Sequence, residues 1–471
     1  MAGMEQLAIR LRLAFIDPGL RKAPFLLELR NWLAPDVESL YWSRRPVVRS
    51  YMRNAGVAMH PRPGAAKAVV SDISDAELRH AIGEKELALR PEKALRKARG
   101  VLAELAAFMD NEKVGAIFVW NGSNLRGALA TYLARQRRIP VIHAEHGYFP
   151  GTTQLDLEGV NGASSMSRLA HAGAAHIPYD DGLDTALDAH IARFKSGERM
   201  RDLNPLPPPD LRRNLYARLV SRVSFWAERR ALPFINRLSV PTTPAHKLPE
   251  RYVVLPFQVR SDSQLMLQSP LYGDDLEAVV RDLDSALERI DAGLRLVAKF
   301  HPYELPLVQR AYRHLPKRYP RVCFVSSAPM AELLGNASAV VTINSTVGFE
   351  AMLLDKPVVA LGRNFYTAPG IVESPRSRGD LEAAVRRALT VPPDAERRRG
   401  FLRFVRARFL VGGGYHDFSP RSLRSVAARI VELLAVTPTG KASGSGAVSG
   451  AIEGEVCSQP APPVGLATSL V

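Results

Sequence analysis

The chain has 471 residues, with 63 Lys and Arg against 47 Asp and Glu, so its formal net charge is +16. This length suits two domains of ordinary size, and a hydrophobic fraction of 46% with 23% charged residues excludes a wholly disordered chain. The sequence has no run of about 18 uncharged apolar residues, no secretory signal, and no metal or disulfide pattern around Cys323 and Cys457. We therefore expect a cytoplasmic protein of a reducing compartment with no membrane-spanning helix and no metal site.

The basic charge calls for an anionic partner or for a cause unrelated to function. A pI near 10 suits nucleic acid, an anionic membrane face or an anionic substrate. A high-GC codon bias, which favours Arg, is the alternative. No aromatic RNA-binding motif, zinc finger or basic helix-turn-helix pattern is present, so we predict no nucleic-acid partner.

The first half of the chain alternates between strand and helix patterns. Residues 7–16 indicate a strand or short helix, and residues 77–109 have helical periodicity. Residues 114–120 form a continuous apolar run of strand length, residues 124–135 are helical, and residues 140–143 form the next strand. Strand, helix and strand in close succession are typical of a parallel sheet.

A proline-rich break separates the two halves. Residues 204–209 read NPLPPP and predict a linker. In residues 211–230, apolar side chains recur at helical spacing among six arginines. This pattern fits either a basic amphipathic helix at a membrane surface or an interdomain helix with a solvated basic face.

The second half repeats the alternation, with a strand at 252–256, a helix at 275–290 and a strand at 295–300, and further strands at 323–325, 339–343 and 357–361. We predict two Rossmann-like α/β domains facing a cleft, in a GT-B-like arrangement. The expected ranges are 1–203 for the first domain, 204–250 for the linker and basic helix, 251–436 for the second domain, and 437–471 for a disordered Gly, Ser, Ala and Pro-rich tail.

Polar residues gather after several predicted strands, where α/β sheets bind ligands. After the strand that ends at residue 142, His143 and His146 flank Glu145, and the loop continues to Asp156. A carboxylate between two histidines can have a pKa suited to acid–base work. A solvated acidic loop residue is the other interpretation.

Two more polar segments follow the strands of the second half. Gln258 and Asp262 lie in the segment PFQVRSDSQ, where Asp262 is either a nucleophile, a hydroxyl ligand or a helix cap. Lys299 and His301 offer two donors for a phosphate, and Pro302 fixes the turn after them.

A fourth segment, Asn344, Ser345 and Thr346, forms a small polar turn between a strand and a helix. Its amides and hydroxyls would face an anion at the helix N-terminus. Ordinary N-capping by Ser345 or Thr346 uses the same geometry, so both interpretations stay open.

Together, the blocks EHGYFPGTTQLDLEGVNG, PFQVRSDSQ, KFHP and TINSTVGFEAMLLDKPVVALGRNFY resemble the capsule polysaccharide biosynthesis proteins of the KpsC/KpsS type, over roughly residues 110 to 375. Members of that family are retaining β-Kdo glycosyltransferases that use CMP-Kdo and start the lipid-linked linker of bacterial capsules. The resemblance implies a GT-B-like fold with a CMP-sugar in the cleft, as in bacterial sialyltransferases that also carry a His-Pro motif.

The resemblance also implies roles for individual residues. Glu145 matches the general acid/base of the family, and Asp262 falls in the block of the nucleophilic aspartate, with Asp156 as the competing nucleophile. Such a double displacement accounts for retention. The donor-binding residues that the resemblance implies are Gln258, Lys299, His301, Pro302, Asn344, Ser345 and Thr346.

The sequence departs from the family pattern in two places: His143 stands where a glutamine is expected, and Phe300 interrupts a Lys-His-His-Pro-like run. The first hundred residues match no motif. Two alternatives therefore remain, a transferase of the same fold with another CMP- or nucleotide-activated sugar, and a non-catalytic capsule assembly or export factor.

The expected partners follow from the same resemblance. They are CMP-Kdo, an anionic glycolipid acceptor, the inner-membrane surface as a peripheral site, and a capsule assembly or export complex. The basic helix 211–230 and an arginine cluster at 397–408 would hold the protein at an anionic membrane. No metal or organic cofactor is expected, because helix dipoles and basic side chains can neutralise the leaving phosphate.

Overall fold

The computed structural model describes residues 10–59, 73–87, 91–196, 242–244, 247–259, 263–301, 311–326 and 328–436. Most of the predicted linker, the basic helix 211–230 and the tail from Thr437 lie outside the described residues, as do Asp262 and Pro302.

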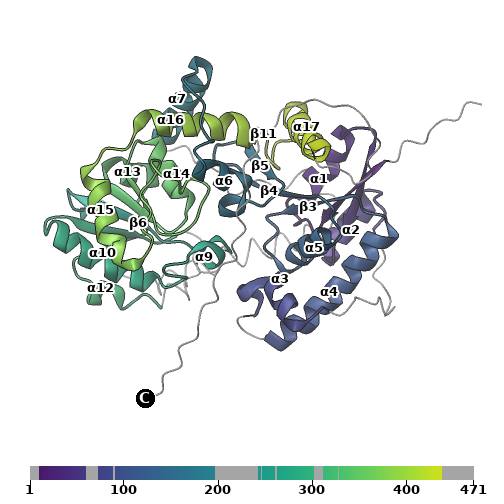
Figure 1. Cartoon of the computed structure of the whole chain (residues 1–471), viewed down its shortest axis with the longest axis horizontal. Helices are drawn as coiled ribbons and strands as arrows, with labels where there is room; N and C mark the ends of the chain where they lie inside the picture. The colour runs from purple at the N-terminus through teal and green to yellow at the C-terminus, as the bar shows by residue number, and fades with distance from the viewer. Residues whose placement is uncertain are drawn as a thin grey trace, which may run out of the picture. The chain divides into compact units, whose positions relative to one another are not determined.

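Two β-sheets organise the chain, and each alternates with helices along the sequence (Figure 1). The first sheet has six strands in the order β11-β5-β4-β3-β1-β2. Strands β2, β1, β3 and β4 run parallel, whereas β5 is antiparallel to both β4 and β11. Its strands are β1 (Leu11–Ile16), β2 (Val37–Trp42), β3 (Ala116–Trp120), β4 (Val141–His146), β5 (Thr152–Asp156) and β11 (Leu410–Gly412).

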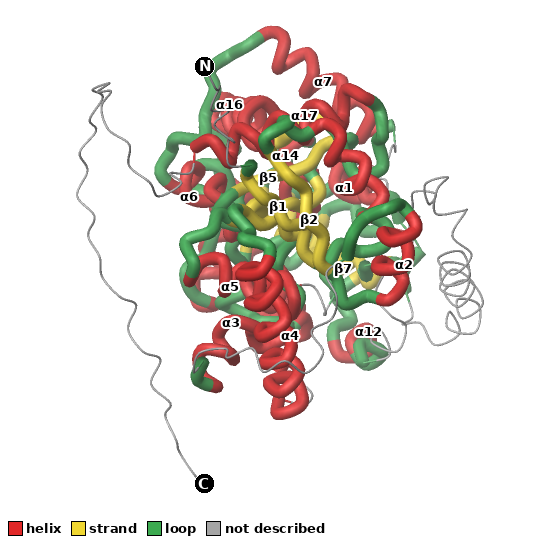
Figure 2. The backbone as a smooth tube through the Cα atoms, turned by 90° about the vertical axis from the view of Figure 1, so that its right-hand side faces the viewer, coloured by secondary structure: helices red, strands yellow, loops and turns green. Residues whose placement is uncertain are grey.

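Helices cover both faces of the first sheet, because alternate side chains of a strand point to opposite faces. Leu13 and Phe15 pack with α1, α2 and α17, whereas Ala14 and Ile16 pack with α3, α4 and α5. Figure 2 shows β1 and β2 with α1 and α2 on one side and α5 on the other. These helices are α1 (Ala23–Leu29), α2 (Pro46–Asn54), α3 (Asp75–Leu87), α4 (Pro91–Asn111), α5 (Leu125–Gln136) and α17 (Pro420–Val436).

The second sheet is wholly parallel, with five strands in the order β10-β9-β6-β7-β8. It is buried on both faces, so its strands are almost continuously apolar; all five residues of β6 are buried. The strands are β6 (Tyr252–Pro256), β7 (Arg295–Lys299), β8 (Cys323–Val325), β9 (Ala339–Thr342) and β10 (Val358–Ala360).

Val253 and Leu255 of β6 pack with α10, α12 and α15 on one face of this sheet, whereas Tyr252 and Val254 pack on the other with α6, α7, α13, α14 and α16. The fold is therefore two Rossmann-like α/β layers in a GT-B-like arrangement, as predicted. The helices are α6 (Ser165–His171), α7 (Asp181–Lys195), α9 (Ser263–Gln268), α10 (Leu276–Ile290), α12 (Leu315–Arg318), α13 (Met330–Asn336), α14 (Thr346–Leu353), α15 (Leu381–Thr390) and α16 (Ala395–Phe404).

The chain crosses between the two layers more often than the predicted ranges allow. Tyr148, Phe149 and the helices α6 and α7 precede the linker, yet they pack in the apolar cluster beneath the second sheet. In the other direction, β11 pairs with β5, and α17 packs on the first sheet. The ranges 1–203 and 251–436 thus each include elements that pack with the other sheet.

Several elements differ from the sequence prediction. The helix expected over 77–109 consists of α3 and α4, and Gly83 interrupts α3 with a φ of 73°. The prediction also lacks β2, β5 and β11. β11 has only three residues, and β5 reads TTQLD, with a single apolar residue. β2 and β11 lie at the two edges of the sheet, where half-exposed side chains weaken the apolar pattern.

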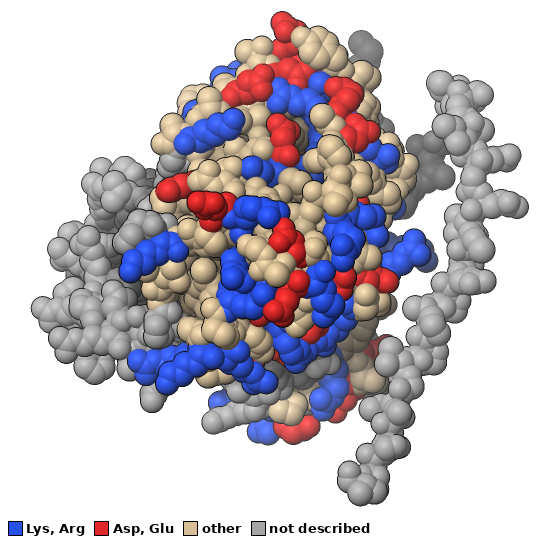
Figure 3. All heavy atoms as spheres, turned by 90° about the vertical axis from the view of Figure 1, so that its left-hand side faces the viewer, with Lys and Arg blue, Asp and Glu red and all other residues tan. Residues whose placement is uncertain are grey.

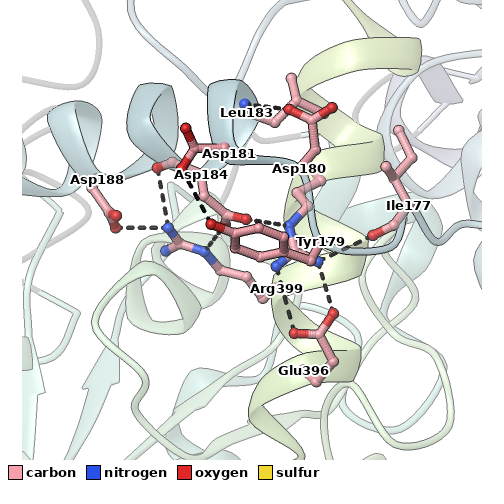
Figure 4. A network of polar contacts seen from close by, with 10 residues as sticks. Ile177, Tyr179, Asp180, Asp181, Leu183, Asp184, Asp188, Glu396 and Arg399 are labelled. Carbon is pink, nitrogen blue, oxygen red and sulfur yellow. Dashed lines mark hydrogen bonds and ion pairs between the residues drawn. The ribbon is translucent and has the colours of Figure 1, made fainter.

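The arginines expected to hold the protein at a membrane are largely used inside the fold. Arg398 and Arg403 are only 4% and 2% exposed. Arg403 donates to Asp184 (2.8 Å) and to Glu396 (2.8 Å), and Arg399 pairs with the same Asp184. This network joins α7 to α16 (Figure 4), so we assign this part of the cluster a structural role.

Basic side chains elsewhere on the surface are often paired as well. On the face that Figure 3 shows, Lys and Arg lie side by side with Asp and Glu. Exposed pairs include Arg378 with Asp282 (2.6 Å) and Arg289 with Glu382 (2.6 Å). Within the part of the chain that the structure describes, no helix is long and apolar enough to cross a membrane.

Candidate functional site

Glu145 lies at the carboxyl end of β4, where the residues that follow β3 reach it. Asn121 Nδ2 donates to one carboxylate oxygen (2.7 Å) and Trp120 Nε1 to the other (3.3 Å). The backbone N–H of His146 also donates to the carboxylate (2.9 Å). Asn121 adopts the left-handed region, with a φ of 64°, which asparagine tolerates better than most residues. This turn aims its amide at Glu145.

The surroundings of Glu145 favour its ionised form. Burial raises the pKa of the carboxyl, but the positive charge of His146, the hydrogen bonds from the His146 amide and Asn121, and the charge of Lys22 together outweigh it, so the pKa lies below its ordinary value. A carboxylate that is ionised near neutral pH can accept a proton. This is the state that a general base requires.

Lys22 reaches the same site from the loop after β1, in the region where the sequence shows no motif. Its ammonium lies 4.8 Å from the ring centre of Trp120 and 5.0 Å from that of Tyr415, which is cation–π geometry. Burial and the nearby Arg21 and Arg45 lower the pKa of Lys22, while Glu145 opposes this shift. Lys22 and Glu145 therefore stabilise each other's charged forms.

A cluster of aromatic rings packs around His146 at this edge of the first sheet. The ring of His146 lies 5.5 Å from that of Trp120 and 4.9 Å from that of Tyr415, and His416 follows 6.5 Å away. Tyr415 and His416 come from the segment between β11 and α17. The sequence analysis missed them because nothing local links them to a loop some 270 residues earlier.

Asp156, the alternative nucleophile, holds a loop together. Its carboxylate accepts hydrogen bonds from the backbone N–H groups of Glu158 (2.8 Å) and Gly159 (3.1 Å) and from both the amide and the hydroxyl of Ser165. The residue is 4% exposed. With its oxygens occupied and little access, Asp156 is poorly placed to attack a sugar, and the geometry favours a structural role.

Gln258 and Asn344 form a reciprocal amide pair at the carboxyl end of the second sheet. Gln258 Nε2 donates to Asn344 Oδ1 (2.7 Å), and the Asn344 backbone N–H donates to Gln258 Oε1 (3.1 Å). Both residues are buried. The pair fixes the residue after β6 to the turn after β9, so the structure brings together two of the sequence-predicted segments.

The 344–346 turn is braced from a second direction. Asn364 Nδ2 donates to the Asn344 carbonyl (2.7 Å), and the Tyr366 hydroxyl donates to the Ser345 carbonyl (2.5 Å). Ser345 is the N-cap of α14, because its hydroxyl accepts from the Val347 amide (3.2 Å). Thr346 begins the helix and is half-buried. The capping interpretation of Ser345 is confirmed, and the helix N-terminus lies at the strand edge.

Lys299 and His301 lie at the end of β7, beside the same edge. Pro256 of β6 lies opposite Lys299 in the sheet register. Burial lowers the pKa of the Lys299 ammonium, and Glu350 of α14 opposes that shift. Burial also lowers the pKa of His301, and the charge of Lys299 adds to the effect. These interactions connect Lys299 electrostatically to both His301 and α14.

Two predicted residues, Asp262 and Pro302, lie outside the described residues. Two hollows that the structure describes, of about 510 and 220 Å³, include none of the predicted site residues.

The candidate site consists of two sets of side chains at strand ends. The first is the Glu145 edge, made of Lys22, Trp120, Asn121, Glu145, His146 and Tyr415; the second is the Asn344 edge, made of Gln258, Lys299, His301, Asn344, Ser345, Thr346 and Asn364.

The fold and these two polar edges define an α/β protein with two Rossmann-like sheets. The sequence profile of the family "Capsule polysaccharide biosynthesis protein" matches residues 115–388, which is more than half of the chain. The chain belongs to this family, as its sequence motifs predicted.

Two relatives illustrate the match. The chain is 32% identical to Protein FixF of Sinorhizobium fredii over 313 residues, which cover 66% of this chain and 63% of FixF. It is 32% identical to the capsule polysaccharide export protein KpsS of Escherichia coli over 155 residues, which cover 31% of this chain and 39% of KpsS. The matched region thus spans less than two thirds of the length of either relative.

Among solved structures, the chain is similar to the β-Kdo 2,4 transferase of Thermosulfurimonas dismutans KpsC, with 17% identity and a TM-score of 0.43. The match covers 68% of this chain and 88% of that one.

Proposed function

We propose that the chain is a glycosyltransferase of capsular polysaccharide biosynthesis that transfers Kdo from CMP-Kdo to a lipid-linked acceptor with retention of configuration. The observation that carries the proposal is Glu145: a carboxylate with a lowered pKa, held by Trp120 and Asn121 at the end of a parallel strand, in the segment that matches the family. This arrangement suits a base that takes the proton of an acceptor hydroxyl.

The Asn344 edge would bind the CMP part of the donor. The N-terminus of α14 and the Lys299 side chain supply positive potential for a phosphate. The pKa of His301 is lowered, which favours the neutral ring, and a neutral ring can still donate one hydrogen bond to a phosphate oxygen. These groups would stabilise the charge that develops on the leaving CMP. In this proposal the donor phosphate is neutralised without a metal or an organic cofactor.

The proposed reaction has two displacements. In the first, the Asp262 carboxylate attacks the anomeric carbon, and the bond from that carbon to the CMP phosphate oxygen breaks with its electron pair on CMP. In the second, an acceptor hydroxyl attacks the same carbon, its proton passes to Glu145, and Asp262 leaves. Two inversions at one carbon give net retention.

The test is release of CMP from CMP-Kdo by the purified full-length chain, with and without a lipid acceptor, beside Glu145→Gln and Asp262→Asn. Acceptor-dependent release that both substitutions abolish, with a β-linked product by NMR, supports the proposal. Release from another CMP- or nucleotide-activated sugar, but not from CMP-Kdo, would show that this other sugar nucleotide is the donor. If CMP neither is released nor raises the melting temperature, the donor assignment is wrong.

Membrane attachment is a separate part of the proposal. With Arg398 and Arg403 buried, the exposed Arg397 and Arg408 and the basic segment 211–230 remain as candidates for contact with anionic lipid at the inner membrane. Deleting residues 211–230 should abolish the salt-sensitive binding of the chain to anionic vesicles. Unchanged binding would exclude this segment.

A further inference from the structure

A buried carboxylate with two arginines lies two strands away from Glu145, at the same end of the parallel strands of the first sheet. Asp17 directly follows β1, and its side chain is 1% exposed. One carboxylate oxygen accepts from the Ser43 hydroxyl (2.8 Å), and the other accepts from Arg45 Nε and from Arg126 Nη1, each at 3.0 Å. Asp17 has a φ of 42°, so the backbone adopts an uncommon conformation at this point.

We propose that Arg45 and Arg126, oriented by Asp17, bind an oxyanion of the acceptor, either a carboxylate or a phosphate. The inference rests on the proposed function, because the ligand is the acceptor of that transfer. Two of its residues, Asp17 and Arg45, lie in the first hundred residues, where the sequence shows no motif, and Arg126 lies in the region that matches the family.

The charges around Asp17 do not balance. Two guanidinium groups share one carboxylate, and neither arginine has a second ion-pair partner within the described part of the chain. The Arg126 side chain is 23% exposed, and in that part of the chain its guanidinium donates only to Asp17. A guanidinium has five N–H donors in a planar fork, so each arginine keeps donors for another anion. Arg45 is accessible, with 45% of its side chain exposed.

Both arginines also stand at helix N-termini. Arg45 immediately precedes α2, which has no side-chain cap, and Arg126 lies in the first turn of α5. The positive ends of two helix dipoles therefore add to the two guanidinium charges. Lys22 is close enough to Arg45 for Arg45 to lower its pKa. The positive region thus extends from Asp17 to the Glu145 edge.

The sheet order sets the spacing between this oxyanion site and the proposed base. Asp17 follows β1 and Glu145 ends β4, with β3 between them. Because neighbouring strands lie about 4.8 Å apart, the two sites are about 10 Å apart along the sheet edge. An acceptor that fits would carry its anionic group about this far from the hydroxyl that receives the sugar.

Single substitutions of the arginines can test the site, because each one leaves the buried Asp17 carboxylate with one ion-pair partner. If Arg45 is replaced, Asp17 keeps Arg126, and the reverse also holds. Arg44 provides a matched control, because it is adjacent in sequence but pairs with Glu104 (3.2 Å). Circular dichroism and the melting temperature would confirm that each variant folds.

Arg45→Gln and Arg126→Gln should each raise the KM for the acceptor about 10- to 100-fold, equal to about 1.4 to 2.7 kcal/mol, with kcat nearly unchanged. Arg44→Gln should leave the KM unchanged. Arg45→Lys should recover part of the loss, because lysine keeps the charge but not the planar fork. An unchanged KM in both Gln variants of an active enzyme would overturn the inference and leave the proposed function intact.

Direct binding separates failure of this inference from failure of the proposed function. Calorimetric titrations would use glycerol 3-phosphate as the phosphate probe and the methyl glycoside of Kdo as the carboxylate probe, with glycerol and the Kdo methyl ester as neutral counterparts. Weaker binding of either anion by both Gln variants, but not by Arg44→Gln, supports the site even if no transfer is found. Equal binding by all proteins, or equal binding of the neutral counterparts, overturns it.

Discussion

The two strand edges of the candidate site are built from different chemistry. At the Asn344 edge, Gln258 donates to the side chain of Asn344 and Asn364 donates to its backbone carbonyl, and all three residues are buried. At the Glu145 edge, the central contacts join a carboxylate to cations and aromatic rings, with Lys22 held over Trp120.

This difference suggests different roles for the two edges, binding at one and proton transfer at the other. An amide network keeps its geometry over a wide pH range, because amides do not titrate, so the three amides of the Asn344 edge suit a fixed binding frame beside the titratable Lys299 and His301. The Glu145 edge contains groups that gain and lose protons, and each charge alters the pKa of the others. Substitutions at the Glu145 edge should therefore change the pH dependence of activity, whereas substitutions of the buried amides at the Asn344 edge should mainly lower stability.

The most severe test removes the charge at the Glu145 edge. Glu145→Gln should lower acceptor-dependent CMP release by about 10²- to 10⁴-fold, the range of general acid–base catalysis, while the melting temperature changes little. The control is Glu158→Gln, because Glu158 forms an exposed pair with Arg168 (2.7 Å) away from this edge. Equal activity of the two variants would remove Glu145 from the chemistry.

The next prediction concerns the stability of the folded chain in acid, which we expect to depend on His143 and not on Glu145. Burial, with a smaller effect of Arg135, lowers the pKa of His143 to about 4. In the unfolded chain, His143 binds a proton near pH 6.5. In the folded chain, it does not bind a proton until about pH 4. The free energy of unfolding should therefore fall by up to about 3 kcal/mol as the pH drops across that window.

His143→Gln, which introduces the residue expected from the family pattern, should remove this part of the pH dependence and leave stability at pH 8 nearly unchanged. Urea unfolding at pH 5 and pH 8 measures both effects. A variant as acid-sensitive as the wild type would show that other groups cause the loss.

At the Asn344 edge, Asn344→Ala should lower the free energy of unfolding by about 1–3 kcal/mol, because it leaves the buried amide of Gln258 without its partner. The loss should be nearly the same at pH 6 and pH 8, since no titratable group is removed. Asn31→Ala is the control, because Asn31 is exposed and its one hydrogen bond is long (3.4 Å). A strongly pH-dependent loss would contradict the proposed division between the edges.

The smallest effect is a shift in a pH profile. Lys22 lowers the pKa of Glu145, so Lys22→Met should move the acidic limb of kcat/KM to higher pH. The variant should approach wild-type activity at alkaline pH and fall behind it as the pH decreases. A loss that is uniform across pH would mean that Lys22 supports the structure and does not tune the base.

The sequence predicted those features that depend on residues close together in the chain. Apolar runs located β1, β3, β4 and most of the second sheet, and polar residues after strands located Glu145, Gln258, Lys299 and the 344–346 turn. The placement of these residues at strand ends is confirmed, because a strand followed by a loop is a short-range pattern. Their roles stay predictions.

Contacts between distant segments were not predictable. Nothing near Glu145 in the sequence indicates Lys22 or Tyr415, and the roles of Asp156 and Arg403 depend on which donors and carboxylates the fold brings to them. A charged residue in a sequence looks the same whether it will bind a ligand, face water or pair internally. Burial and partners distinguish these outcomes, and both depend on tertiary structure.

The pairing of β5 with β11 has a consequence for how the protein is made. The Thr153 hydroxyl donates to the Gly413 carbonyl across 260 residues (2.8 Å), so the first sheet cannot be completed until nearly the whole folded part of the chain has left the ribosome. Contacts of such high sequence separation slow folding, and the unpaired edge of β5 is exposed to other chains in the meantime. A chain truncated before residue 410 would keep every residue from Asp17 to Thr346, yet would expose this edge permanently. Synthesis of residues 410–436, which contain β11 and α17, therefore determines when the edge of the first sheet is covered.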